Sequence, residues 1–329
     1  MSSTLAIAAS GAVFGGALLA AGVTAPSVVI GQMQLADLHM LKVFVVGSAS
    51  SALVLKVLQR AGYTLKARQP TNLGWLGPYD GNIIGGLLIG IGMTLTGSCP
   101  GTVFAQLGSG IPNSSLILLG GILGGTIYTA TSKNLKTKAA TEAEPATSLT
   151  ISQKTGWDAN TTLLLFEAIC AATVILADIL SPHVGETRLN PLFGGILIGL
   201  SQLTSVLLTN STLGISSSYE EAGKHIWKII KPSNEHISNN SIIFAFGTVL
   251  GSFVLSKVLP GLVRVQGVDV VVSPVRAVMG GAVMAFGSRL GMGCTSGHGI
   301  SGMALLGVSS FVSVVSMFGS GMGVAALIG

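Results

Sequence analysis

Residues 85–101 read Gly-Gly-Leu-Leu-Ile-Gly-Ile-Gly-Met-Thr-Leu-Thr-Gly-Ser-Cys-Pro-Gly, and residues 280–297 read Gly-Gly-Ala-Val-Met-Ala-Phe-Gly-Ser-Arg-Leu-Gly-Met-Gly-Cys-Thr-Ser-Gly. A constant offset of 195 residues aligns the opening glycine pairs without gaps and matches Cys99 with Cys294. Each copy is an apolar helical pattern that ends in a glycine-rich break with a thiol. Glycine at such a helix end permits positive φ and close backbone approach.

The composition places this repeat in a lipid bilayer. Only 9% of the 329 residues are charged, whereas a soluble domain carries about 25%, and the mean hydropathy is +0.72. The apolar runs are long and do not alternate with polar residues, which argues against a β-barrel. We therefore expect an all-α polytopic membrane protein that crosses the cell membrane several times.

The repeat predicts two pseudo-symmetric halves with broken or re-entrant helices that meet in the middle of the membrane. Broken backbone survives there only inside protein or beside a polar cavity, and paired glycine-interrupted segments are typical of a transporter binding site. Whether the halves are inverted stays open at this point. The alternative is that glycine-rich helices merely pack closely and that their cysteines are small buried hydrophobic residues.

The hydrophobic segments predict about eight or nine membrane helices at ~20 residues per span. We expect a first transmembrane half over residues 1–131, a mobile polar linker over 132–158 and a second half over 159–329. We interpret residues 219–240 as a charged surface loop. The expected spans and half-spans are residues 4–23, 38–58, 82–98, 101–110, 112–129, 160–179, 192–208, 241–258, 277–292 and 300–328.

The charges and cysteines limit the possible partners. The net charge of +5 indicates loops that face an anionic leaflet rather than nucleic acid. The basic loop after residue 58, with Lys66 and Arg68, is the best cytoplasmic candidate. Three cysteines are too few for a disulfide framework and form no metal-ligand cluster. Without a phosphate loop, hydrolase triad or haem motif, we expect neither an enzyme nor a bound cofactor or metal.

The two break thiols, Cys99 and Cys294, are the first candidates for substrate contact. A thiol is a soft, polarizable group and a weak hydrogen-bond donor, so it suits a soft sulfur anion better than a hard oxyanion. Cys170 lies in the middle of a span without a partner in the repeat, and we interpret it as a packing residue.

Other residues near the breaks carry charge or hydrogen-bond donors. Arg289, inside an apolar run, could attract an anion or pair with an acid such as Glu167 or Asp178. His298 could donate to a substrate or simply be hydrogen-bonded at a helix break. Backbone and hydroxyl donors at helix N-termini form a generic anion site. The candidate path residues are Cys99, Cys294, Arg289, His298, Gly97, Pro100, Gly101, Thr295, Ser296 and Gly297.

Residues 92–101 and 289–299 resemble the YeeE/YedE (sulfur transport) family of membrane proteins, which includes thiosulfate importers. The resemblance implies a narrow path in the middle of the membrane on which cysteines contact thiosulfate. It makes Cys99 and Cys294 two of those path cysteines, and a small sulfur anion such as thiosulfate the substrate. Bacterial members can carry a further cysteine near the N-terminus, but residues 4–34 contain none.

Two other classes of function remain open from the sequence. A membrane enzyme could exchange thiols or sulfane sulfur and use Cys99 and Cys294 covalently. A membrane scaffold would transport nothing. Uptake of labelled thiosulfate into vesicles separates an importer from both.

Overall fold

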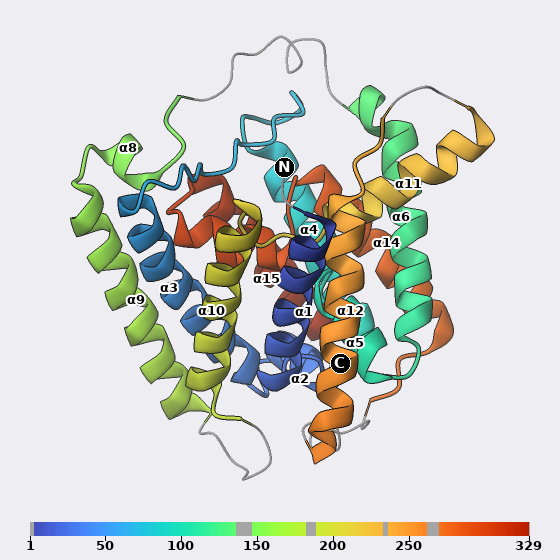
Figure 1. Ribbon diagram of the computed structural model, residues 1–329, viewed down its shortest axis with the longest axis horizontal. Coiled ribbons are helices and arrows are strands. Elements are labelled where there is room, and N and C mark those ends of the chain that lie inside the picture. Colours follow the sequence, from blue (N-terminus) through green and yellow to red (C-terminus); the bar gives the residue numbers. More distant parts are fainter. Residues whose placement is uncertain (1–2, 136–146, 182–188, 233–235, 262–269, 329) are drawn as a thin grey trace.

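The computed structural model describes residues 3–135, 147–181, 189–232, 236–261 and 270–328, and these are mostly helical (Figure 1). The helices are α1 (Thr4–Ala20), α2 (Pro26–Met33), α3 (His39–Arg60), α4 (Asp80–Thr96), α5 (Thr102–Ser109), α6 (Ser114–Leu135), α8 (Ile151–Thr155), α9 (Ala159–Leu180), α10 (Pro191–Thr209), α11 (Ser217–Ile230), α12 (Asn240–Val258), α14 (Pro274–Leu290), the π-helix η1 (Thr295–Gly302) and α15 (Val308–Ile328).

Many of these helices suit a membrane. Six in the described part of the chain are long and apolar enough to cross one, namely α3, α6, α9, α10, α12 and α15. Helices α1 and α4 are apolar but shorter, with 17 residues each. With these two, the described residues contain eight apolar helices, which agrees with the lower end of the expected eight or nine. The protein is a multi-pass, all-α integral membrane protein, as the sequence predicts.

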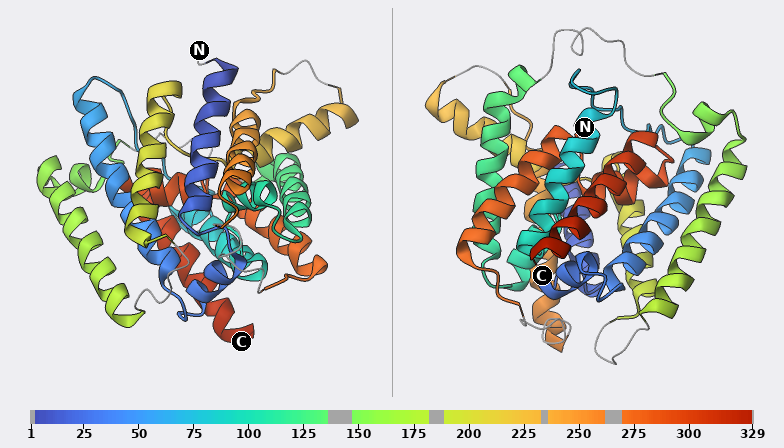
Figure 2. Two further views of the ribbon diagram at one scale, coloured as in Figure 1. Left: turned by 60° about the horizontal axis from the view of Figure 1, so that its bottom comes forward. Right: turned by 180° about the vertical axis from the view of Figure 1, so that it is seen from behind.

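The two faces of the bundle differ in what they carry. We call the face with residues 61–79 and α8 the upper face, and the face with the end of α12 the lower face (Figure 1). The N-terminus lies at the upper face and the C-terminus at the lower one (Figure 2). Helices α1 and α4 run downward, whereas α10 and α14 run upward.

Helices of the two halves pack on one another in matching pairs. Helix α1 packs on α12, and α10 packs on α3; likewise α4 packs on α15, and α14 packs on α6. Helix α4 also packs on α14, and α1 on α10. Each half therefore completes the packing of the other. Pseudo-symmetry of the whole halves is compatible with this pattern and stays our interpretation.

Four of the quoted glycines, Gly85, Gly92, Gly280 and Gly287, lie where α4 and α14 cross. A Cβ added to Gly85 would lie 2.7 Å from the carbonyl oxygen of Gly287, and one added to Gly92 would lie 2.6 Å from that of Gly280. Because Gly85 matches Gly280 and Gly92 matches Gly287, these contacts are reciprocal, as in a self-complementary interface. The repeat thus preserves a close crossing that side chains would block.

Two polar segments are more ordered than the sequence suggests. The expectation of a surface loop over residues 219–240 is wrong for its first half, because α11 forms there with Tyr219 and Gly223 buried against α6. Within the expected linker, α6 continues to Leu135, α8 starts at a capping box, and the Ile151 amide donates to the Leu306 carbonyl. Residues 136–146 lie outside the described residues, and the three-part division stays a prediction.

Candidate functional site

The first break joins α4 to α5 and packs against the turn before α2. Helix α4 ends at Gly97, whose φ is +60°, and a Cβ there would lie 2.7 Å from Cβ of Pro26. The side-chain amide of Gln106 donates to the carbonyls of Gly97, at 3.1 Å, and Thr24, at 2.8 Å. One buried side chain on α5 therefore holds two breaks together.

Cys99 lies at the start of α5 and is buried. Its backbone amide donates to Oγ1 of Thr102 at 2.7 Å, and the amide of Thr102 donates to Sγ of Cys99 at 3.3 Å. The sulfur consequently sits at a helix N-terminus, where unpaired amides and the helix dipole favour negative charge.

Cys294 lies in the second break, between α14 and η1, and is fully buried. Its Sγ is 3.2 Å from Oγ of Ser296. Ser216, Ile215 and Gly297 also lie close enough to this sulfur to interact with it electrostatically. Ser216 and Ile215 belong to the segment between α10 and α11, residues 210–216, which we call the third break. The second break meets the third break there. A π-helix such as η1 is rare and often marks a functional site.

The two thiol-bearing breaks approach each other at Gly101. A Cβ on Gly101 would lie 3.8 Å from Sγ of Cys99, 3.8 Å from Oγ of Ser296 and 3.5 Å from Ile215. The same serine contacts Cys294, so the missing side chain of Gly101 leaves room between Cys99 and Ser296. The structure thus brings Cys99, Gly101, Ser296 and Cys294 together.

A small cavity of about 30 Å³ borders this point. Cys99, Gly101, Thr295 and Ser296 line one side of it, and apolar side chains of α1, α3 and α10 line the rest. Such a volume holds one or two water molecules, so an oxyanion of sulfur does not fit without movement. Thr295 directs its hydroxyl at the sulfur of Met317, 3.6 Å away.

Arg289 is paired with an acid that the sequence analysis did not consider. Its Nη2 and Nε lie 2.5 and 2.8 Å from Oε2 of Glu220 on α11. Glu167 and Asp178 are not its partners: Asp178 lies 2.9 Å from Nζ of Lys42. The pair compensates the charge of Arg289 within the bundle.

His298 and Pro100 hold the breaks in place. The two ring nitrogens of His298 lie 3.0 Å from Oγ of Ser310 and 2.8 Å from the carbonyl of Gly291. The histidine therefore ties η1 to α14 and α15, as expected for a hydrogen-bonded residue at a helix break. The carbonyl of Pro100 accepts from the hydroxyl of Tyr219 at 2.9 Å, which links the first break to α11.

Arg68 is a site residue that the sequence analysis treated only as a loop charge. It comes from the loop between α3 and α4, yet its Nε donates to the carbonyl of Gly297 at 3.1 Å and its Nη1 to that of Met292 at 2.9 Å. No sequence signal places a residue 226 positions away beside Cys294, because the contact depends on how the loop folds over the second break.

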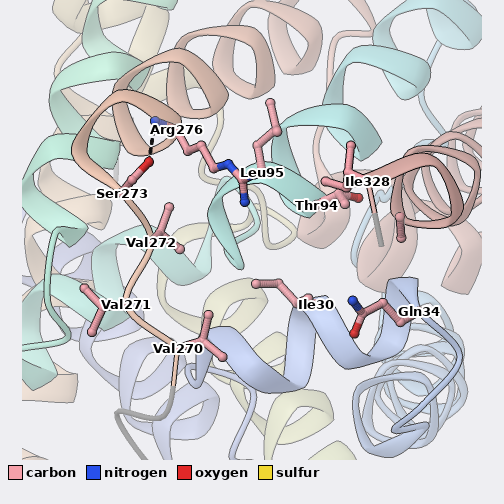
Figure 3. A pocket seen from close by; sticks show the side chains of 11 residues that line it. Ile30, Gln34, Thr94, Leu95, Val270, Val271, Val272, Ser273, Arg276 and Ile328 are labelled. Atoms are coloured by element: carbon pink, nitrogen blue, oxygen red, sulfur yellow. Dashed lines mark hydrogen bonds between the residues drawn. The ribbon is translucent and has the colours of Figure 1, made fainter.

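A larger cavity, of about 420 Å³, lies apart from the thiols between α2, α4, α14 and α15. Arg276 and Gln34 project toward it from different helices, among mostly apolar side chains (Figure 3). Thr94, which the repeat matches with Arg289, also lines it. Neither break cysteine borders this cavity, so it does not join the two thiols.

A helical membrane bundle with paired breaks at corresponding positions has the architecture of a secondary transporter. The chain belongs to the sulphur transport family, whose model matches residues 20–324. This confirms the resemblance to the YeeE/YedE family.

Curated relatives are transporters by name. The chain is 22% identical over 266 residues to the thiosulfate transporter TsuA of Escherichia coli (strain K12), which covers 73% of this chain and 72% of the relative. It is 32% identical over 139 residues to probable transporters of two Xylella fastidiosa strains, 9a5c and Temecula1. That match spans 93% of each relative but 42% of this chain, so each is about the size of one half.

We expect Arg289→Gln to destabilise the protein by about 3 kcal/mol, because it leaves Glu220 with a poorly compensated charge inside the bundle. Adding Glu220→Gln should recover most of that loss. Lys224→Gln is the matched control, since Lys224 pairs with the same glutamate but is largely exposed. The effect is measured as the loss of folded protein on heating, monitored by size-exclusion chromatography. Equal losses in the single and double variants would contradict a structural ion pair.

Proposed function

We propose that the protein imports thiosulfate or a related small sulfur-containing anion along a narrow path on which Cys99 and Cys294 contact the sulfur of the substrate. The observation that carries this proposal is that the two repeat-matched breaks approach at Gly101, which lies between Cys99 and the serine that contacts Cys294. Membership of the sulphur transport family and the name of the Escherichia coli relative support the class of substrate.

The surroundings of the two sulfurs suit a passing anion. The Thr102 amide donates to Sγ of Cys99, and the Ser296 hydroxyl lies 3.2 Å from Sγ of Cys294. Amide donors at helix ends are a common anion site, and a thiol adds a soft, weak donor for a terminal sulfur. Weak binding at successive positions favours passage, because an ion must leave each site as readily as it enters.

Passage requires the breaks to move. The cavity beside Cys99 is only about 30 Å³ and is lined mostly by apolar side chains, so we expect the path to open when helices shift. In broken-helix transporters such shifts are movements of one repeat against the other around a fixed site. Here the Gln106 and Tyr219 hydrogen bonds, which tie the breaks together, are the contacts that such movement would strain.

Uptake of ³⁵S-labelled thiosulfate into proteoliposomes tests the proposal. We expect uptake above that of protein-free vesicles, competition by sulfite, sulfate or selenite in an order that reports specificity, and intact thiosulfate inside. Absence of uptake by the wild-type protein would refute transport. A persulfide that accumulates on Cys99 during turnover would instead favour the sulfane-sulfur exchange enzyme.

Cys294→Ala is expected to reduce uptake at least tenfold, because Cys294 belongs to the meeting point of the breaks. Cys170→Ala is the matched control: Cys170 is equally buried but lies on α9, which packs mainly on α3. Uptake per folded transporter should be unchanged in this control. Equal, mild effects at both cysteines would show that Cys294 only fills space.

A further inference from the structure

Arg68 is held where the second and third breaks meet. Two backbone carbonyls, those of Gly297 and Met292, accept hydrogen bonds from its Nε and Nη1. Its Nη2 lies 3.0 Å from the positions that a Cβ would take on Gly214 and on Gly297. The guanidinium is therefore fixed on one edge, while its other edge faces two residues that have no side chain.

The charge of Arg68 has no carboxylate partner among the described residues. The ion pairs there join Lys42 to Asp178 and join Glu220 to Arg289 and Lys224. Two of the five N–H donors of an arginine are used by the carbonyls, so others remain for a ligand. Arg68 also lies close enough to Cys294 for their charges to interact.

A cavity of about 160 Å³ lies beside the third break, and Arg68 is linked to it through Gly214 rather than lining it. Gly214, whose Cβ position is the one beside Nη2, lines it. The apolar side chains of Ile7 and Phe244 line it as well, together with the polar side chains of Ser205, Thr209, Ser211, Thr212, Asn240 and Ser241, and none of these lining residues is acidic.

A carboxylate on α11 contacts one of the lining residues, Ser241. Glu221 accepts hydrogen bonds from the amides of Ser241 and Ile242, at the start of α12. Those bonds commit it to capping that helix. The cavity therefore combines hydroxyl and amide groups with one fixed cation nearby, which is a suitable setting for an anion.

We propose that Arg68 is an anion-binding residue at the upper end of the path and binds the oxygen atoms of the sulfur anion. The proposal rests on the proposed function and divides recognition between two groups. The planar guanidinium fork matches an oxyanion, whereas the thiols of Cys99 and Cys294 match a terminal sulfur. A guanidinium already fixed by two carbonyls loses little entropy when the anion binds.

Equilibrium binding of ³⁵S-thiosulfate to purified protein in lipid nanodiscs tests this site. Arg68→Gln should weaken binding about tenfold or more without changing the number of sites per folded protein. Arg68→Lys should fall between it and the wild type, because it keeps the charge and loses the fork. Lys66→Gln, an exposed residue of the same loop, should bind as the wild type does. High salt should weaken wild-type binding more than Arg68→Gln binding, because the removed charge is what salt screens.

Competition by sulfate separates the two parts of the recognition. Sulfate has the oxygen atoms and lacks the terminal sulfur, so Arg68→Gln should lose most of this competition and Cys99→Ala should keep it. A dissociation constant for Arg68→Gln within twofold of the wild type would overturn the proposal, as would a variant that loses sites without losing affinity. Uptake by the wild-type protein in parallel proteoliposomes separates failure of the Arg68 site from failure of the proposed function. If the wild type takes up no thiosulfate, both proposals fail. If it does and Arg68→Gln binds normally, only the Arg68 site fails.

Discussion

Cys99→Ala is expected to abolish thiosulfate uptake while leaving nearly the normal amount of folded protein. Loss of one sulfur atom from a buried site costs on the order of 1 kcal/mol, which a membrane bundle of this size tolerates. Loss of the thiol removes the soft contact beside Gly101, where the two breaks approach. Uptake of ³⁵S-thiosulfate per folded transporter measures the effect.

Cys99→Ser distinguishes thiol chemistry from shape. A hydroxyl has a similar size and is a stronger donor but a harder one, so we expect only a small part of the uptake to return. Full uptake by the serine variant would show that position 99 needs any donor rather than sulfur. Normal uptake by the alanine variant would remove Cys99 from the path altogether.

Gly85→Ala should cost most of the folded protein. Its new Cβ would lie 2.5 Å from the amide nitrogen of Gly291 and 2.7 Å from the Gly287 carbonyl oxygen. Both are backbone atoms, so the cost is at the upper end of overpacking, about 3 kcal/mol. Gly319→Ala on α15 is the control, because nothing lies within 4 Å of its added Cβ.

The yield of monodisperse protein and its thermal midpoint measure both glycine variants. Wild-type behaviour of Gly85→Ala would mean that α4 and α14 do not cross closely in the membrane. A loss in Gly319→Ala as large as that in Gly85→Ala would assign the effect to helix propensity instead, since alanine should if anything favour the helix.

The sequence contains enough information to predict the helices and the pairing of the breaks. Apolar length locates the spans to within a few residues, as for residues 160–179 against Ala159–Leu180. The glycine spacing of the repeat predicts close packing, and the structure shows the crossing of α4 and α14. The matched thiols also mark the two breaks that meet at Gly101.

The parts that could not be predicted depend on tertiary neighbours. Helix α11 carries several charged side chains, so its sequence resembles a surface loop until its packing on α6 is known. The partner of Arg289 was missed for the same reason, because Glu220 lies on α11. Arg68 reaches the second break only through the path of its loop, and no periodic pattern records that path.

The exchange of helices between halves has a consequence for biosynthesis. Helices α1 and α4 leave the ribosome long before α12 and α15, on which they pack. Until then, glycines such as Gly90 on α4 face lipid or the insertion machinery, since Gly90 packs on the backbone of Met317 on α15. Final assembly must wait for the last segment of the chain, and contacts so distant in sequence form slowly. A chain that stops at the linker therefore leaves the glycines of α1 and α4 without the helices on which they pack in the complete bundle.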